Sequence, residues 1–415
     1  MTDQQILRNL AKQYADIAAD PINNIRRDLW RAHNSLKRTR VLIYTRAFAF
    51  NEMPESHCQC EDPFFRRHEY DLRYKIYWAS LQDDCPFEPW LAVNAITITP
   101  PAGIWGVPMQ WHSIDQPGSS RRIDPPLKDE SDLEKLVTPR HYINEEKTAQ
   151  RFAQMQDAIG DILHVVVDRG PAWRTWHADL SSDLGHLRGI EEFMWDIADR
   201  PEWLHRLMAF LRDGVLKAHA EAEAAGDWSL INHINQAVPY AEELPDPSAP
   251  PPTTPSATPA PTPLKHLWTF CSSQETTLLG PAQFDEFILQ YQLPIVSQFG
   301  LISYGCCEDL TNKIDVLRQI PNLRRIAVAP VADVAKCAEK IRTDYVLSYR
   351  PSPSDMVGYD FSPDRIRRIL KRDLEASRGC IVDITLKDVE TVERDPTRMR
   401  RWMQITREIL EEMGM

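Results

Sequence analysis

The stretch Leu301-Ile-Ser-Tyr-Gly-Cys-Cys-Glu-Asp309 begins as a short apolar strand and becomes a polar corner after Tyr304. Cys306, Cys307 and Glu308 would then place two thiols and a carboxylate at the tip of that strand. In barrels of parallel strands, chemistry takes place at the carboxyl-terminal ends of the strands. This stretch therefore predicts one strand of the fold and the position of a site.

Similar runs recur along the chain and are separated by segments with helical periodicity. Near-continuous apolar runs are typical of parallel strands that are covered by helices. Eight strands alternating with helices predict an α/β fold, a (β/α)8 TIM barrel. A doubly wound open sheet is the alternative, but it usually carries a GxGxxG turn, which this sequence lacks. With Leu301–Tyr304, the strand candidates are residues 41–45, 90–94, 162–168, 266–270, 325–329, 345–349 and 380–386.

The chain divides into a short N-terminal part and the barrel. Residues 1–40 are expected to form an N-terminal helical segment, and residues 41–415 the barrel. Residues 242–264 read EELPDPSAPPPTTPSATPAPTPL, a Pro-rich composition without aromatic residues that cannot pack a core. We expect a disordered surface loop that interrupts the barrel, with a linker between two domains as the alternative.

Composition limits the classes of partner. A net charge of −12 argues against a nucleic-acid partner, which would require a basic face. No run of about 18 apolar residues is present, so no membrane span is expected. The N-terminus lacks a secretory apolar region, which favours a cytoplasmic location. The eight cysteines then indicate free thiols or metal ligands more than disulfides.

Tryptophan is abundant in the first half of the sequence. These residues indicate either core packing or an aromatic wall around a flat or apolar ligand. They are Trp30, Trp78, Trp90, Trp105, Trp111, Trp173, Trp176 and Trp195.

Several polar residues follow the predicted strands and are candidate site residues. Glu275, Tyr304, Glu308 and Asp168 are candidate catalytic groups. Glu275 has an alternative role as a helix-capping carboxylate, and Asp168 as an ion-pair partner of the adjacent arginine. If Tyr304 points into the barrel, strand alternation predicts that Cys306 does too.

A second set of residues suits ligands and metals. Arg46, Arg350 and Lys387 are candidate substrate-binding groups, because arginine binds carboxylates bidentately. For Lys387 the alternative is an ion pair with the next residue. Thiolate ligands suit zinc, copper or iron, with zinc first. The candidate metal ligands are Cys306, Cys307, Glu275 and Cys60.

The sequence resembles the uroporphyrinogen decarboxylase superfamily, which includes corrinoid-linked methyltransferases. The resemblance covers nearly the whole chain and implies a (β/α)8 barrel. It rests on the stretches Cys60-Glu-Asp-Pro-Phe64, Ser273-Gln-Glu275, Phe299-Gly-Leu-Ile-Ser-Tyr-Gly-Cys-Cys-Glu308, Ile320-Pro-Asn-Leu-Arg-Arg325 and Ile384-Thr-Leu-Lys-Asp388.

Two departures from the family pattern indicate a divergent branch. The first-strand motif of the decarboxylase has two arginines, whereas here Arg46 is followed by Phe50 at the second arginine's place. An apolar ring cannot pair with a carboxylate, which argues against porphyrinogen decarboxylation. The zinc methyltransferases carry His-x-Cys where this chain has Tyr304-Gly305-Cys306, and their later cysteine has no match.

The resemblance implies a metal-dependent methyltransferase or demethylase acting on a small organic substrate. The methyl group would pass to or from a corrinoid, carried by a corrinoid protein as partner. The alternatives are a decarboxylase or other lyase of a small carboxylic acid, and a copper- or iron-dependent oxidoreductase of specialised metabolism. A non-catalytic binding protein is the remaining interpretation.

Overall fold

The computed structural model describes residues 1–46, 48–113, 121–172, 178–229, 238–246 and 262–415. Most of the Pro-rich loop, together with Trp173 and Trp176, lies outside these ranges. The part of the chain that the structure describes contains no helix of the length and hydropathy that a membrane span requires.

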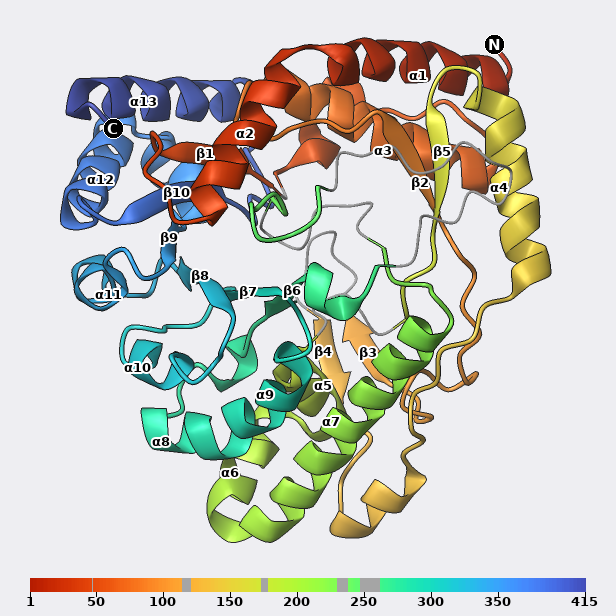
Figure 1. Cartoon of the computed structure of the whole chain (residues 1–415), viewed down its shortest axis with the longest axis vertical. Coiled ribbons are helices and arrows are strands. Elements are labelled where there is room, and N and C mark those ends of the chain that lie inside the picture. Colours follow the sequence, from red (N-terminus) through yellow and green to blue (C-terminus); the bar gives the residue numbers. More distant parts are fainter. Residues whose placement is uncertain (47, 114–120, 173–177, 230–237, 247–261) are drawn as a thin grey trace.

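Six parallel strands form one curved sheet in the order β1-β10-β9-β8-β7-β6 (Figure 1). Each strand is almost entirely buried, as the apolar runs predict. The strands are β1 (Leu42–Thr45), β6 (Trp268–Cys271), β7 (Leu301–Tyr304), β8 (Leu323–Val328), β9 (Val346–Tyr349) and β10 (Ile381–Leu386).

Two further parallel strands, β2 (Trp90–Asn94) and β5 (His164–Asp168), form a separate pair (Figure 1). The eight predicted strands are therefore all present, with ends within two residues of the prediction. Within the described ranges, no ladder joins β1 to β2 or β5 to β6. The structure thus shows an α/β fold with a six-stranded half-barrel and a two-stranded complement.

A polar hairpin of β3 (Gln110–Ser113) and β4 (Arg121–Asp124) was not among the predicted elements. These two strands lack the apolar runs on which the prediction of the others depended.

Helices cover the outer side of the six-stranded sheet, and α1 packs against α3 beside the β2–β5 pair (Figure 1). Ser362 caps α12 by accepting a hydrogen bond from the Arg365 amide. The helices are α1 (Asp3–Ala19), α2 (Ile22–Asn34), α3 (Pro63–Ser80), α4 (Glu145–Ile159), α5 (Leu180–Arg188), α6 (Ile190–Asp199), α7 (Pro201–Ala224), α8 (Pro281–Phe284), α9 (Gln290–Val296), α10 (Ile314–Leu317), α11 (Val334–Ile341), α12 (Pro363–Ala376) and α13 (Thr397–Met413).

Candidate active site

The face of the sheet that points away from helices α8–α12 carries a buried ion-pair network. Arg325 of β8 lies 2.8 Å from Asp383 of β10 and donates hydrogen bonds to Asn34 and Ser348. His33 of α2 lies 3.2 Å from Asp383 on its other side. Burial opposes the charged form of Asp383, but Arg325 and His33 lower its pKa to about 2. This network is fully internal and ties α2 to the sheet.

Arg350 lies two residues beyond Ser348 of this network, and its guanidinium has no carboxylate partner among the described residues. It follows β9 and is 1% exposed. All three guanidinium nitrogens are buried and have no hydrogen-bond partner among the residues that the structure describes. Burial lowers the pKa of Arg350, and the nearby Cys306 and Asp383 oppose that effect. A buried, unpaired guanidinium costs about 1–3 kcal/mol, so it requires an explanation beyond packing.

Lys387, directly after β10, contacts both thiols of the predicted corner. Its ammonium lies 3.1 Å from the Cys307 sulfur and 3.6 Å from the Cys306 sulfur. It also forms the predicted ion pair with Asp388. Burial opposes the ammonium, yet the Cys306 sulfur and the Asp388 carboxylate raise the pKa of Lys387. Lys387 is therefore a buried cation held against sulfur.

The two thiols divide into a buried neutral group and an exposed thiolate. Their sulfurs lie 3.5 Å apart. The hydrogen bond from Cys306 and the Lys387 ammonium lower the pKa of Cys307 to about 6, against the effect of burial. The same hydrogen bond and burial raise the pKa of Cys306. Of the two thiols, Cys307 thus has the lower pKa and is favoured as the thiolate, which is the reactive form of cysteine.

Tyr304 and Cys306 do not share a face, because Gly305 interrupts the alternation of the strand. Gly305 has a φ of 105°, a left-handed conformation that glycine adopts readily. The Tyr304 hydroxyl donates to Gln292 across 2.8 Å, and its ring meets Phe284 edge-on. Both partners belong to the helix layer. The structure therefore places Tyr304 in the outer core, while Cys306 faces Lys387.

Glu308 joins two strand ends. Its carboxylate accepts hydrogen bonds from the Ser273 amide (2.9 Å) and the Cys306 amide (2.7 Å). It is 1% exposed. Both carboxylate oxygens thus accept hydrogen bonds from backbone amides, so Glu308 positions the thiol corner against the end of β6.

Glu275 belongs to a second polar cluster, around the start of α5. It accepts hydrogen bonds from the hydroxyls of Ser181 (2.7 Å) and Ser182 (2.9 Å). Asp179 caps the same helix and is 1% exposed. Burial and the Glu275 charge raise the pKa of Asp179 to about 7. Asp179 was missed in the sequence, although the Asp-Leu-Ser-Ser pattern is a helix-cap signal.

The remaining predicted residues lie at separate positions. Asp168 ends β5 and accepts a hydrogen bond from the Gly170 amide, while Arg169 pairs with Glu145 and Asp227 instead. Arg46 follows β1, and its amide donates to the Leu386 carbonyl, which places it beside Lys387 in the register. It lines a cavity between β1 and β2.

Cys60 makes its contacts with residues outside the thiol corner. Its amide donates to Glu69 across 2.7 Å, and its sulfur contacts the Asp3 carbonyl of α1. The structure therefore does not assemble Cys306, Cys307, Glu275 and Cys60 into one site. Over the described ranges, no three His, Cys, Asp or Glu side chains converge as metal ligands. Two thiols beside an ammonium do not fit a zinc centre, which needs about four converging donors.

Comparison with known proteins identifies a fold relationship. No protein-family model matches the chain, and no curated protein sequence matches it. A solved structure of a methyltransferase from Methanosarcina mazei is similar, with a TM-score of 0.51 and 13% sequence identity. The match covers 94% of this chain and 98% of that chain. At this identity the likeness extends to the fold alone.

Proposed function

We propose that this chain is a methyltransferase or demethylase that acts on a small anionic organic substrate at the corner of Arg350, Lys387 and Cys307. The observation that carries the proposal is the Arg350 guanidinium, which is buried and has no hydrogen-bond partner. Arginine binds carboxylates through paired hydrogen bonds, and such a ligand would satisfy it. The fold likeness to a methyltransferase supports the choice of reaction class.

The complete architecture belongs to the same proposal. We propose that residues 41–415 form one (β/α)8 unit, with the β2–β5 pair completing the half-barrel, and that residues 1–40 are a helical extension of it. The eight parallel strands support this arrangement.

The reaction would proceed by methyl transfer to a nucleophile. The bond between the methyl carbon and the substrate heteroatom breaks, and its electron pair stays on the heteroatom. The acceptor supplies the pair for the new bond. A reduced corrinoid, delivered by a partner protein, is the proposed acceptor and is a second substrate. Lys387 would donate a proton to the heteroatom left behind, and the ion pair with Asp388 would help to keep Lys387 charged before that step.

Decarboxylation of a small carboxylic acid is the second candidate. The same unpaired Arg350 favours it, since that guanidinium would anchor a carboxylate. Lys387 would then protonate the carbon that loses carbon dioxide. The two candidates differ in product, which makes them separable in one assay.

The test incubates the protein with reduced cobalamin and three methylated acids: N,N-dimethylglycine, methoxyacetate and methylthioacetate. Methylcobalamin formation, followed by absorbance, supports the proposal, and carbon dioxide release favours the second candidate. Arg350→Met should lower kcat/KM about 100-fold or more, because a charge-assisted bidentate contact is lost. Arg318→Met is the matched control, since Arg318 pairs with Asp344 on the surface. Neither product from any acid would contradict both candidates.

A further inference from the structure

A large cavity lies on the open side of the half-barrel, between β1 and β2. It has a volume of about 900 Å³ and is bounded by α3, by both strands and by the segment 85–88. Small-molecule sites typically measure about 300–1,000 Å³. Because no ladder joins β1 to β2 in the described ranges, the cavity occupies space that strand pairing would otherwise close.

Aromatic rings form a connected wall of this cavity. Trp78 of α3 contacts the Tyr44 ring at 5.5 Å and the Phe87 ring at 5.8 Å between centroids. Tyr14 of α1 meets Phe87 edge-on, and Trp90 of β2 also lines the space. Trp78 and Trp90 are among the tryptophans for which the sequence left packing and ligand binding open. These rings are each 9% exposed or less, so a planar guest would meet only the small part of each ring that borders the cavity.

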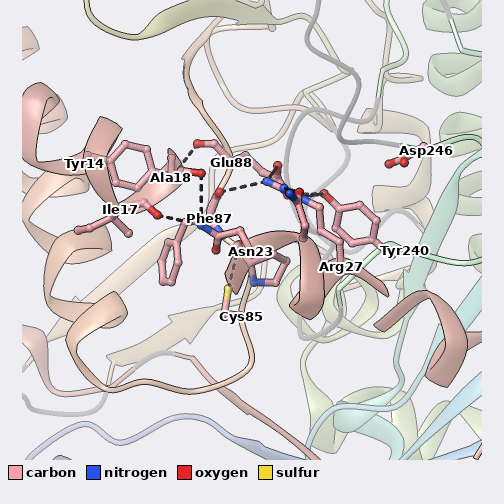
Figure 2. A network of polar contacts seen from close by, with 12 residues as sticks. Tyr14, Ile17, Ala18, Asn23, Arg27, Cys85, Phe87, Glu88, Tyr240 and Asp246 are labelled. Carbon is pink, nitrogen blue, oxygen red and sulfur yellow. Dashed lines mark hydrogen bonds and ion pairs between the residues drawn. The ribbon is translucent and has the colours of Figure 1, made fainter. Parts of the chain in front are cut away.

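A polar network holds Glu88, one of the lining residues, in place (Figure 2). The Tyr14 hydroxyl donates to the Glu88 carbonyl across 2.9 Å. Arg27 pairs with the Glu88 carboxylate at 2.8 Å, and the Tyr240 hydroxyl donates to the same carboxylate (Figure 2). The Glu88 carboxylate is thus already paired with a cation.

The other two acids that line the cavity are also engaged. Asp71 pairs with Lys75 at 2.8 Å. Asp62 caps α3 by accepting from the Phe64 amide at 2.9 Å. Of the three lining carboxylates, Glu88 and Asp71 are paired with cations, and Asp62 is held by backbone amides at the start of α3.

Three arginines of the lining make no ion pair with any residue that the structure describes: Arg46, Arg67 and Arg151. Arg67 and Arg151 are exposed, which places them at the mouth, and Arg151 lies over the Phe64 ring at 6.0 Å. Arg46 is half-buried at the end of β1. The mouth is therefore basic while the interior is aromatic.

The geometry points to a binding site for a planar aromatic acid between β1 and β2. Its ring would lie against Trp78, Phe87 and Trp90, and its carboxylate or sulfonate would face Arg67 and Arg151. Arg350, Lys387 and Cys307 are not among the residues that line the cavity, and the inference does not depend on the reaction proposed at their corner.

The test titrates the full-length protein with 2-naphthoate and follows tryptophan fluorescence and calorimetric heat. The neutral analogue 2-naphthylmethanol and the non-aromatic cyclohexanecarboxylate are the comparison ligands. We expect one bound naphthoate per chain and roughly tenfold weaker binding of each comparison ligand, since each lacks one of the two contacts. Removing both cations in Arg67→Met/Arg151→Met should weaken naphthoate about tenfold or more and leave the alcohol unchanged.

A cavity-filling variant tests the location. Ala92 lies on β2 in the lining, so Ala92→Phe should abolish binding of both naphthalenes. Arg350→Met and Arg318→Met should bind naphthoate as the natural chain does. Photolabelling the unmodified protein with 4-benzoylbenzoate gives an independent readout that does not depend on the variant folding. We expect labels on α3 or residues 85–94.

Three results would overturn the inference. The first is absence of saturable naphthoate binding. The second is equal affinity for the acid and the alcohol. The third is labelling that is confined to other parts of the chain. Weakening by Arg350→Met as strong as that by the double variant would assign the acid to the strand-end corner instead.

Discussion

Arg325 and Arg350 are buried equally, on neighbouring strands and the same face of the sheet, yet only Arg325 has a carboxylate. Arg325 is 0% exposed and lies against Asp383, whereas Arg350 is 1% exposed and its guanidinium makes no hydrogen bond with any residue that the structure describes. A paired buried charge is a structural device, because either partner alone would be unstable. A buried charge without a partner lowers the stability of the fold, so the fold alone does not explain its presence. By this difference we assign Arg325 to the structural scaffold and Arg350 to the proposed site.

The largest expected effect is on the scaffold side of this comparison. Arg325→Met should lower the free energy of unfolding by about 3–5 kcal/mol, because it leaves the Asp383 charge buried without its partner. Urea denaturation at pH 7 measures it. The double variant Arg325→Met/Asp383→Asn should recover part of the loss. Additive losses in the double variant would mean that the pair contributes through packing and not through charge.

Replacing Arg350, at the proposed site, should change the free energy of unfolding in the opposite direction. Arg350→Met should raise the free energy of unfolding by about 1–3 kcal/mol, since it removes a buried cation that has no partner. The same urea experiment measures this change, with Arg318→Met expected to alter stability by about 0–1 kcal/mol. A destabilisation as large as that of Arg325→Met would place Arg350 in the scaffold.

The second polar cluster, around Asp179 and Glu275, should make the stability of the protein depend on pH. The pKa of Asp179 is raised to about 7 by burial and by Glu275, above its value in the unfolded chain. The folded state therefore holds more protons than the unfolded state between about pH 4 and pH 7, and this group's contribution to stability falls as pH rises. Asp179→Asn should remove that fall. Urea midpoints at pH 4.5, 6 and 7.5 measure it, and an unchanged slope in the variant would contradict the assignment.

Much of the fold follows from the apolar runs, because a strand buried on both faces must be apolar throughout. The eight parallel strands were found in this way, while β3 and β4 were missed because they are polar. The same logic predicted that Cys306, Arg350 and Lys387 lie at strand ends, and the structure places each of them within two residues of the end of a strand. Asp179 was missed because it follows no strand and precedes a helix.

What the sequence could not supply is the partner of each polar group. Glu308 and Arg350 both follow strands, but the Glu308 carboxylate accepts from two backbone amides, whereas the Arg350 guanidinium has no hydrogen-bond partner among the described residues. Tyr304 lost its predicted shared face with Cys306 through a single positive φ at Gly305. Such contacts depend on elements that are distant in sequence, so strand alternation alone does not determine them.

The smallest expected effect concerns the corner itself and shows whether its thiolate depends on Lys387. Cys307 has a pKa of about 6, so its alkylation by iodoacetamide should rise with a midpoint near pH 6. Lys387→Met removes the ammonium that lies 3.1 Å away, and the midpoint should move to higher pH. Mass spectrometry of the Cys307 peptide measures the rate, and Cys58, whose pKa burial raises, is the internal reference. If the midpoint stays near pH 6 in Lys387→Met, the Cys306 hydrogen bond alone stabilises the thiolate, and Lys387 is free to act as the proton donor without holding that charge.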